Sequence, residues 1–299
     1  MKRTNINAIS PVTNMILTCI FTIGMLLCVY PIVLVLGISI SDEHNLLNDG
    51  YQLFPTHNLT LYAYQFIFKW AYMLVNSYGI TILVTVVGAA GSTFLISLYA
   101  YPLSRKEFRF RRQFTFYAMF TMLFNGGVIS WYIVNVKVLH IDNTIWALIL
   151  PYLMNAFYVL IMRTFYKTSI PDAVLESARI DGAGEFRTFF TIVFPLAVPG
   201  IATIALFSTL QYWNDYFLPL YLVSDSRLYN LQFMMYKTLE NIRVLQTINN
   251  PDVTDLILKL PGESARMAMC ILSIGPIIFA YPFFQKYFIK GLTIGAVKG

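Results

Sequence analysis

The feature that most constrains this chain is a run of apolar residues, about Met15 to Ile40, that contains no charged side chain. A helix of about 20 such residues is long enough to cross the hydrocarbon core of a bilayer. A cleaved signal peptide is the competing interpretation. This run is longer than the roughly 7–15 apolar residues of a signal peptide, and no small-residue cleavage site follows it. We therefore interpret it as a retained membrane-spanning helix.

Further apolar runs have the length of a membrane span. They cover about 74–101, 114–134, 144–162, 193–222 and 267–288, and the second of these is interrupted by Asn125-Gly126-Gly127. Only 12% of the 299 residues are charged, against roughly 25% in a soluble domain, so lipid must cover much of the surface. The sequence predicts an all-α integral membrane protein with six transmembrane helices in a single domain, residues 1–299.

Lysine and arginine gather in alternate loops, and this pattern predicts the orientation of the spans. Positive charges precede the first span, follow the second and fourth, and end the sixth, whereas loops 41–70 and 135–143 are poorer in them. Both termini and the loop 163–192 are therefore predicted to be cytoplasmic, and the segment 223–265 to be an outer loop. Because the charges lie at the ends of apolar runs, we assign the net charge of +6 to orientation and expect no nucleic-acid partner.

The sequence lacks the motifs that would indicate an enzyme. It contains no phosphate-binding G-x-x-x-x-G-K-[ST] loop, no nucleophile elbow, no paired carboxylates and no zinc-binding histidine pair. The three cysteines lie inside apolar runs without metal-ligand spacing, and the three histidines are scattered in predicted outer loops. We expect no catalytic residue, no metal site and no resident cofactor in this chain.

The segment 169–195 contains the most informative local pattern. Ser169 and Asp172 have the spacing of a capping box, and Pro171 is near the expected first helical position. A short helix is predicted from there to about Arg179.

A tight turn and a second helix are predicted to follow. Asp181-Gly182-Ala183-Gly184 should end the first helix, and Glu185 should begin the next. Four apolar residues of this second helix are expected on one face: Phe186, Phe189, Phe190 and Val193. A compact helical knob of this kind could dock onto a soluble partner. An ordinary amphipathic loop is the alternative that the shape alone leaves open.

The order of residues in this segment resembles the EAA loop of ABC importer permeases. That pattern has Glu-Ala-Ala, a glycine four residues after the last alanine, and a later Ile-x-Leu-Pro. Here Glu176-Ser177-Ala178 precedes Gly182 and Ile192-Val193-Phe194-Pro195 follows, with Ser177 and Phe194 departing from the pattern. The Ile-Asp-Gly-Ala run at 180–183 resembles the carbohydrate branch of the family.

Other regions extend the resemblance over nearly the whole chain. Asn76-Ser77, Tyr101–Arg105 and Trp213–Tyr216 resemble signatures of the family, and the ending Gly291–Gly299 resembles that of permeases similar to the maltose permease. The runs 124–127 and 143–147 resemble most a branch that imports complex oligosaccharides, which includes the rhamnogalacturonan and alginate permeases.

The resemblance implies a type I ABC importer permease fold and a permease subunit of an ATP-driven oligosaccharide importer in the bacterial plasma membrane. It implies several partners: a second, homologous permease subunit, two ATP-binding-cassette subunits that bind ATP and magnesium, and an extracytoplasmic solute-binding protein. The outer loop 223–265 matches in place a loop that reaches into the binding protein in the maltose system. The residues that the resemblance assigns to ATPase coupling are Glu176, Ser177, Ala178, Asp181, Gly182, Ala183 and Pro195.

Polar and aromatic side chains within predicted spans three to five are candidates for the substrate pathway, because polar groups within a span are costly unless they have a function. The candidates are Asn125, Tyr132, Asn155, Tyr158, Gln211, Tyr212, Trp213, Asn214 and Asp215. An interfacial aromatic belt is an alternative role for Tyr132 and Trp213. Interhelical hydrogen bonding is an alternative for Asn155. Asp215, the one acidic residue of the predicted spans, is expected near the outer mouth or paired with the companion subunit.

Three other functions stay open at this point. The first is an ABC permease for another small solute, and the second is an ion-driven secondary transporter. The third is a membrane sensor or structural subunit without transport of its own. Secondary transporters often contain internal repeats and intramembrane charges, whereas this chain has no evident repeat. The sequence names neither the exact sugar nor the companion subunit.

Overall fold

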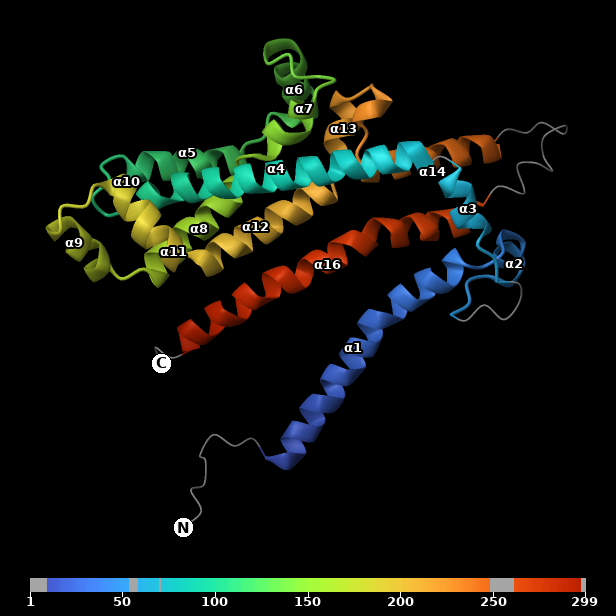
Figure 1. Ribbon diagram of the computed structural model, residues 1–299, viewed down its shortest axis with the longest axis horizontal. Helices are drawn as coiled ribbons and strands as arrows, with labels where there is room; N and C mark the ends of the chain where they lie inside the picture. Colours follow the sequence, from blue (N-terminus) through green and yellow to red (C-terminus); the bar gives the residue numbers. More distant parts are fainter. Residues whose placement is uncertain (1–9, 54–58, 70, 248–260, 297–299) are drawn as a thin grey trace. The chain divides into compact units, whose positions relative to one another are not determined.

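The computed structural model describes residues 10–53, 59–69, 71–247 and 261–296. Within these ranges the chain is helical, and the only β-type pairing is an isolated bridge between Ser41 and Leu59 (Figure 1). The all-α class predicted from the sequence is confirmed. The chain divides into two compact units, which are described separately: Met1–Trp70 with Leu239–Ile274, and Ala71–Thr238 with Gly275–Gly299.

The first unit begins with α1, Pro11–Ser39. The Ser10 hydroxyl caps this helix by accepting a hydrogen bond from the Thr13 amide at 3.2 Å, and proline suits the first helical position because it has no N–H to leave unpaired. None of the most apolar 18 consecutive residues of α1 is buried, and Leu27 is 69% exposed. A helix that exposes apolar side chains on all sides requires lipid or a protein partner as its surroundings.

In the rest of the first unit, a carboxylate connects two helices. It contains α2 (Glu43–Asp49), α3 (Tyr62–Phe68) and the start of α16 (Glu263–Ala296). The Glu43 carboxylate accepts hydrogen bonds from the amides of Glu263 at 2.9 Å and Ser264 at 3.0 Å. A negative charge at a helix N-terminus satisfies free amides and is favoured by the helix dipole.

The centre of the second unit is α4, Ala71–Ser104, a helix of 34 residues. Two shorter helices pack along it, α8 (Ala156–Ser169) and α12 (Val198–Trp213) (Figure 1). Helices α4 and α12 approach closely at Gly88, where an added Cβ atom would lie 2.5 Å from the Tyr212 ring. Small residues allow helices in lipid to approach in this way.

The helices α1 and α4 are each long and apolar enough to cross a membrane. Their positions agree with the first two predicted spans, 15–40 and 74–101. Three further candidates are pairs of helices bent at a short break, which gives up to five spans within the described ranges. The sixth predicted span, 267–288, lies inside α16.

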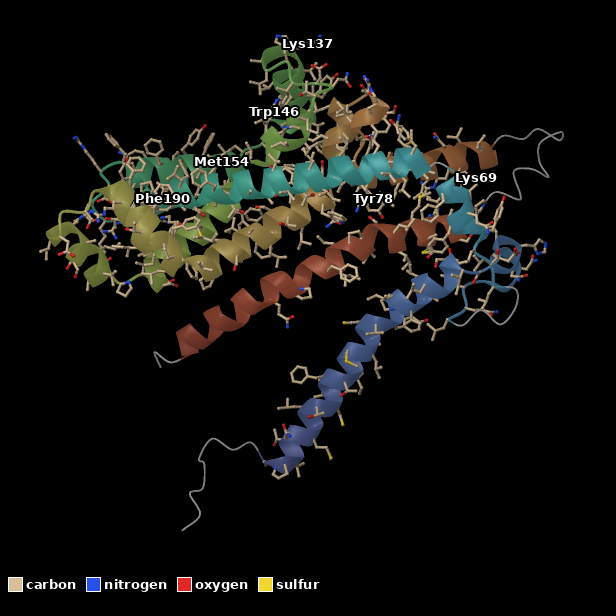
Figure 2. All side chains as sticks on the ribbon, viewed as in Figure 1. Lys69, Tyr78, Lys137, Trp146, Met154 and Phe190 are labelled. Carbon is tan, nitrogen blue, oxygen red and sulfur yellow. The ribbon has the colours of Figure 1, made fainter. Side chains whose placement is uncertain are left out.

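The third predicted span breaks where the sequence indicated. Helix α5 (Arg111–Leu123) ends before Asn125, and α6 (Gly127–Ile133) continues as a π-helix to Val138, bent by 114° from α5. The second half projects away from α4, with Lys137 near its far end (Figure 2).

Spans four and five were predicted as single helices, and the structure corrects both. In span four, α7 (Ile145–Ile149) continues as a 3₁₀ turn to Tyr152 and meets α8 at 48°. In span five, the helical stretch Glu185–Leu196 meets α12 at 80°, and α13 (Phe217–Leu222) is separate. Pro151, Pro195 and Pro199 lie at or near these breaks, where proline removes an amide donor from the helical ladder.

The predicted outer loop 223–265 contains a long helix. Helix α14, Leu231–Thr247, occupies much of it, and a 3₁₀ turn covers Ser226–Leu228. The tip of this segment, residues 248–260, lies outside the described residues.

Candidate functional site

The segment 169–195 folds as a helix, a turn and a second helix, as predicted. Helix α9 spans Asp172–Ile180, and α10 spans Glu185–Thr188. The predicted capping box is wrong. Ser169 is the last residue of α8, and the residue before α9 is Pro171, which makes no side-chain cap. Because Ser169 is helical, it cannot adopt the extended backbone that an N-cap needs.

The turn between α9 and α10 depends on glycine. Gly182 has φ +73°, in the left-handed region that favours glycine. The amide of Gly182 donates to the Arg179 carbonyl at 3.0 Å, and the amide of Ala183 donates to the Ala178 carbonyl at 2.9 Å. These bonds satisfy the last carbonyls of α9, as in a glycine-terminated helix.

The apolar residues after the turn do not share one face. Phe189 and Val193 are each 1% exposed, whereas Phe186 is 75% exposed and Phe190 48%. The Phe189 ring lies 5.2 Å from the ring of Tyr101 at the end of α4. A π-helix over Phe189–Val193 changes the residue spacing within the helix, so the buried face is narrower than predicted.

The residues that the resemblance assigned to coupling separate into two groups. Glu176, Ser177, Asp181, Gly182 and Pro195 are exposed, whereas Ala178 is buried and Ala183 partly buried. Two large apolar side chains flank the turn and are mostly exposed: Ile180 is 86% exposed and Phe186 75%. The sequence analysis included Phe186 in an apolar helix face and Ile180 in the run 180–183, but it assigned neither to the coupling surface, although apolar residues beside a glycine turn are a usable signal. Together the exposed residues form an outward surface of mixed polarity.

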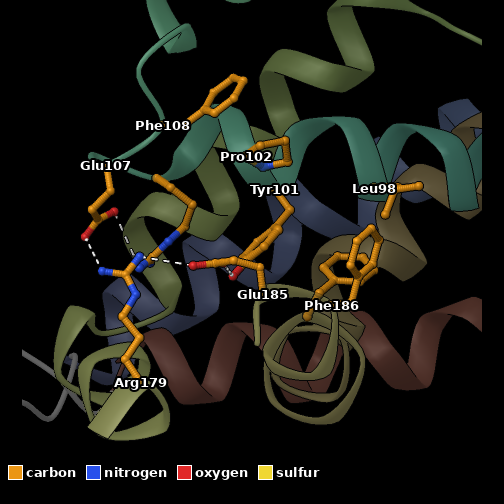
Figure 3. Close-up of a pocket in the computed structure, with 10 residues that line it drawn as sticks. Leu98, Tyr101, Pro102, Glu107, Phe108, Arg179, Glu185 and Phe186 are labelled. Carbon is orange, nitrogen blue, oxygen red and sulfur yellow. Dashed lines mark hydrogen bonds and ion pairs between the residues drawn. The ribbon is translucent and has the colours of Figure 1, made fainter. Parts of the chain in front are cut away.

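A network of ion pairs ties this segment to the loop after α4 (Figure 3). Arg179 bonds Glu107 and Glu185, each at 3.2 Å. Glu185 in turn accepts a hydrogen bond from the Tyr101 hydroxyl at 2.8 Å. Arg105 lies 3.7 Å from Glu107. A bond from its own backbone amide, with Arg105 and Arg179 nearby, holds the pKa of Glu107 below its ordinary value, so this carboxylate is ionised at neutral pH.

The same residues surround a cavity of about 470 Å³. Apolar side chains line much of it: Leu98, Pro102, Phe108, Phe186 and Phe189. The charged groups of Arg105, Glu107, Arg179 and Glu185 also line it. Figure 3 shows the ion-paired side chains on one side of the drawn group and Leu98 and Phe186 on the other.

Three of the pathway amides bond to nearby backbone. The side-chain oxygen Oδ1 of Asn155 accepts hydrogen bonds from the amides of Phe157 at 3.0 Å and Tyr158 at 3.4 Å, and so caps α8. Asn125 accepts from Gly127 at 2.9 Å, and the Asn214 amide group donates to the Leu210 carbonyl at 3.0 Å. Side chains that satisfy backbone groups at a helix break make the break tolerable inside a membrane.

Asp215 also serves the backbone. It is 7% exposed, and its Oδ1 accepts from the Phe217 amide at 3.0 Å, the Leu218 amide at 3.3 Å and the Tyr152 hydroxyl at 3.0 Å. Its own carbonyl accepts from the Asn230 side chain at 2.5 Å. Through its carboxylate and its backbone carbonyl, Asp215 therefore connects the 3₁₀ turn after α7, the start of α13 and the start of α14. Sequence reasoning missed Tyr152 and Asn230, because both are distant from Asp215 in the chain.

The aromatic candidates differ in exposure. Tyr212 is 1% exposed, and its hydroxyl donates to the Ile149 carbonyl at 2.8 Å. Its ring lies 5.9 Å from that of Tyr152, so Tyr212, Tyr152 and Asp215 form one cluster. Tyr158 is half-buried and stacks on Phe207 at 5.8 Å. Of the remaining candidates, Trp213 is buried, Gln211 is partly buried, and Tyr132 on α6 is 39% exposed.

Comparison with known proteins gives consistent matches over most of the chain. A model of the family described as "binding-protein-dependent transport system inner membrane component" matches residues 7–294. The chain is similar to the polygalacturonan/rhamnogalacturonan transport system permease protein YtcP of Bacillus subtilis (strain 168), with 37% identity over 92% of this chain and 94% of that protein. It is also similar to the arabinooligosaccharides transport system permease protein AraQ of Halalkalibacterium halodurans, with 27% identity over 97% and 98% of the two chains.

A solved structure has a similar fold. The match is to a bacterial ABC transporter involved in the import of the acidic polysaccharide alginate, with a TM-score of 0.76 and 29% sequence identity. It covers 94% of this chain and 99% of that one. The similarity therefore extends to the arrangement of the helices.

Proposed function

Since the chain belongs to the family of binding-protein-dependent transport system inner membrane components, we propose that it is a permease subunit of an ATP-driven importer of oligosaccharides. The observation that supports this most is the family match, which covers residues 7–294. Members of this family are transport subunits rather than enzymes. The three relatives named above all take part in saccharide transport by their names.

The arrangement in the membrane follows from the helices and the charges. We count α1, α4 and each of the three bent pairs as one span, and we add α16, which contains the predicted span 267–288, so that the proposed permease domain has six spans. We place both termini and the α9–α10 segment in the cytoplasm, because lysine and arginine are concentrated on that side. We place the chain in the inner membrane of a bacterium, because the family description names an inner membrane component and the named relatives are bacterial.

The exposed surface around the α9–α10 turn is the site that would dock onto an ATP-binding-cassette subunit. Glu176, Ser177 and Asp181 provide polar contacts there, and Ile180 and Phe186 provide apolar ones. Gly182 and Ala183 let a partner approach the turn closely, and Pro195 ends this segment. ATP and magnesium would bind to the two ATPase subunits, and a second, homologous permease would complete the pathway. A solute-binding protein would deliver the sugar, with α14 and the following residues as its contact.

For the substrate we propose oligosaccharides that contain uronic acids. Two of the named relatives transport polygalacturonan/rhamnogalacturonan and alginate, by their names. Among the pathway candidates, Tyr158 and Gln211 are the strongest for contact with sugar, because both are only partly buried. Asn155 and Asp215 bond to backbone amides, and so their contribution to the pathway is to shape it.

The test is assembly followed by uptake. The tagged chain is purified from its native membrane in mild detergent, and we expect a second permease and an ATPase to accompany it. The complex, reconstituted with its binding protein, should take up labelled oligogalacturonate only when ATP is present on the ATPase side. A neutral arabino-oligosaccharide is the control for substrate class.

Other results would point to the alternative functions. Recovery of the chain alone, under conditions that keep a known importer assembled, would contradict the coupling role. Uptake that persists without ATP and stops with an ionophore would indicate an ion-driven transporter. ATP-driven uptake of a small solute, with no oligosaccharide transported, would retain the permease and overturn the substrate class.

A further inference from the structure

Two neighbouring residues of the loop after α4 bind the two ends of α9. Lys106 pairs with Asp172 in the first turn at 2.8 Å, and Glu107 pairs with Arg179 in the last turn at 3.2 Å. At 1.5 Å per residue, these two positions on α9 are roughly 10 Å apart. On α9 itself, the acidic Asp172 is at the start and the basic Arg179 at the end, and the helix dipole favours these charges at these positions.

These pairs connect α9 to the last turn of α4 by several routes. Arg105, at the end of α4, approaches Glu107 at 3.7 Å. Arg179 also binds Glu185 of α10, which accepts a hydrogen bond from Tyr101 of α4. All of these residues belong to the second unit, so the contacts lie within one compact body.

Apolar packing alone leaves α9 loosely oriented. Only Leu175 and Ala178 of its nine residues are buried, so apolar contacts hold this helix at two positions on one face. The side chains of Lys106 and Asp172 are 70% and 59% exposed, and exposed ion pairs contribute little to overall stability. Because the pairs Lys106–Asp172 and Glu107–Arg179 lie at opposite ends of α9, they instead restrict the rotation of α9 against α4.

We propose that Lys106 and Glu107 form a charge bracket that fixes α9 to the end of α4 and passes its movement into that spanning helix. This inference rests on the proposed function, in which an ATPase docks at the α9–α10 turn. With the bracket intact, a displacement of α9 moves α4 with it. With the bracket broken, α9 can move while α4 stays in place, so ATP is hydrolysed without matching transport.

The experiment measures two rates on the complete complex in proteoliposomes: uptake of labelled oligogalacturonate and hydrolysis of ATP. We expect Lys106→Glu and Glu107→Gln each to lower the uptake per ATP by roughly fivefold or more, within the range by which mutations change coupling. Lys106 has no other ion-pair partner within 4 Å among the described residues, so the double variant Lys106→Glu/Asp172→Lys should restore the ratio.

The control variant is Arg112→Gln, which removes one positive charge at the start of α5. Arg112 is exposed and forms no ion pair in the part of the chain that the structure describes, so its ratio should match that of the unmodified protein. Each variant is first checked for recovery with the ATPase, which separates loss of coupling from loss of folding.

The proposal is overturned if Lys106→Glu and Glu107→Gln keep the normal ratio, or if the Lys106/Asp172 charge exchange fails to restore it. Failure of the proposed function itself would be seen earlier and differently. The unmodified protein would then show no ATP-dependent uptake, and the coupling role of the charge bracket would be rejected together with the proposed function.

Discussion

Close packing at single residues sets the distance between the helices of the second unit. Gly88 of α4 lies against the flat ring of Tyr212, and an added Cβ would meet three ring carbons at 2.5–2.7 Å. The ring is rigid and its hydroxyl is bonded to the Ile149 carbonyl, so it cannot move without loss of that bond. The sequence has small residues at 88–92, which permit close helix packing, but it does not indicate which aromatic side chain fills the space.

We expect Gly88→Ala to destabilise the protein by about 1–3 kcal/mol, the usual effect of overpacking. The measurement is thermal unfolding of the purified chain in detergent. Gly79→Ala in the same helix is the matched control, because an added Cβ at Gly79 meets nothing within 4 Å. An equal change in both variants would mean that helix propensity, and not the contact with Tyr212, decides the stability.

At the scale of elements, short sequence patterns predicted the turns and helices that depend on neighbouring residues. The glycine turn at 181–184 and the helices beside it depend on neighbouring residues, and their limits were predicted within a residue or two. The bends of 48° and 80° were not predicted, because an apolar run gives the length of a span and not its direction. The ion pairs of Lys106 and Glu107 join residues 66 and 72 positions apart, and no spacing rule connects such positions.

Asn155 gives a prediction for one of these bends. Because its side chain caps α8 where the helix leaves the break, Asn155→Leu should cost about 1 kcal/mol of stability and lower assembly and transport together. Asn155→Ser should retain most of both, since serine is also a good N-cap. The measurements are copurified ATPase and uptake rate. Loss of transport with full assembly in Asn155→Leu would instead favour direct contact with sugar.

At the scale of the whole molecule, the composition predicted that lipid covers much of the protein surface, and the exposed side chains of α1 agree with that. Only 12% of the residues are charged, and α1 exposes apolar side chains on every side. The family and the overall fold could be inferred from residue order in segments that together span the chain. The contacts that connect those segments required the structure.

Two native cysteines report on the surroundings of α1. Cys19 and Cys28 are both exposed on this helix, and only a thiolate in water reacts quickly with a maleimide. In intact membranes we expect little labelling of either cysteine by a charged maleimide, and full labelling after denaturation in detergent. Cys19→Ser and Cys28→Ser variants assign the signal. Fast labelling in intact vesicles would place that part of α1 in water.

The contact of Glu43 with the start of α16 has a consequence for biosynthesis. The acceptor leaves the ribosome early, whereas its donors, the amides of Glu263 and Ser264, are more than 200 positions later in the chain. The first unit therefore stays incomplete through most of translation, with α1 already made. A polypeptide that terminates before Glu263 therefore leaves the Glu43 carboxylate without these two amide donors.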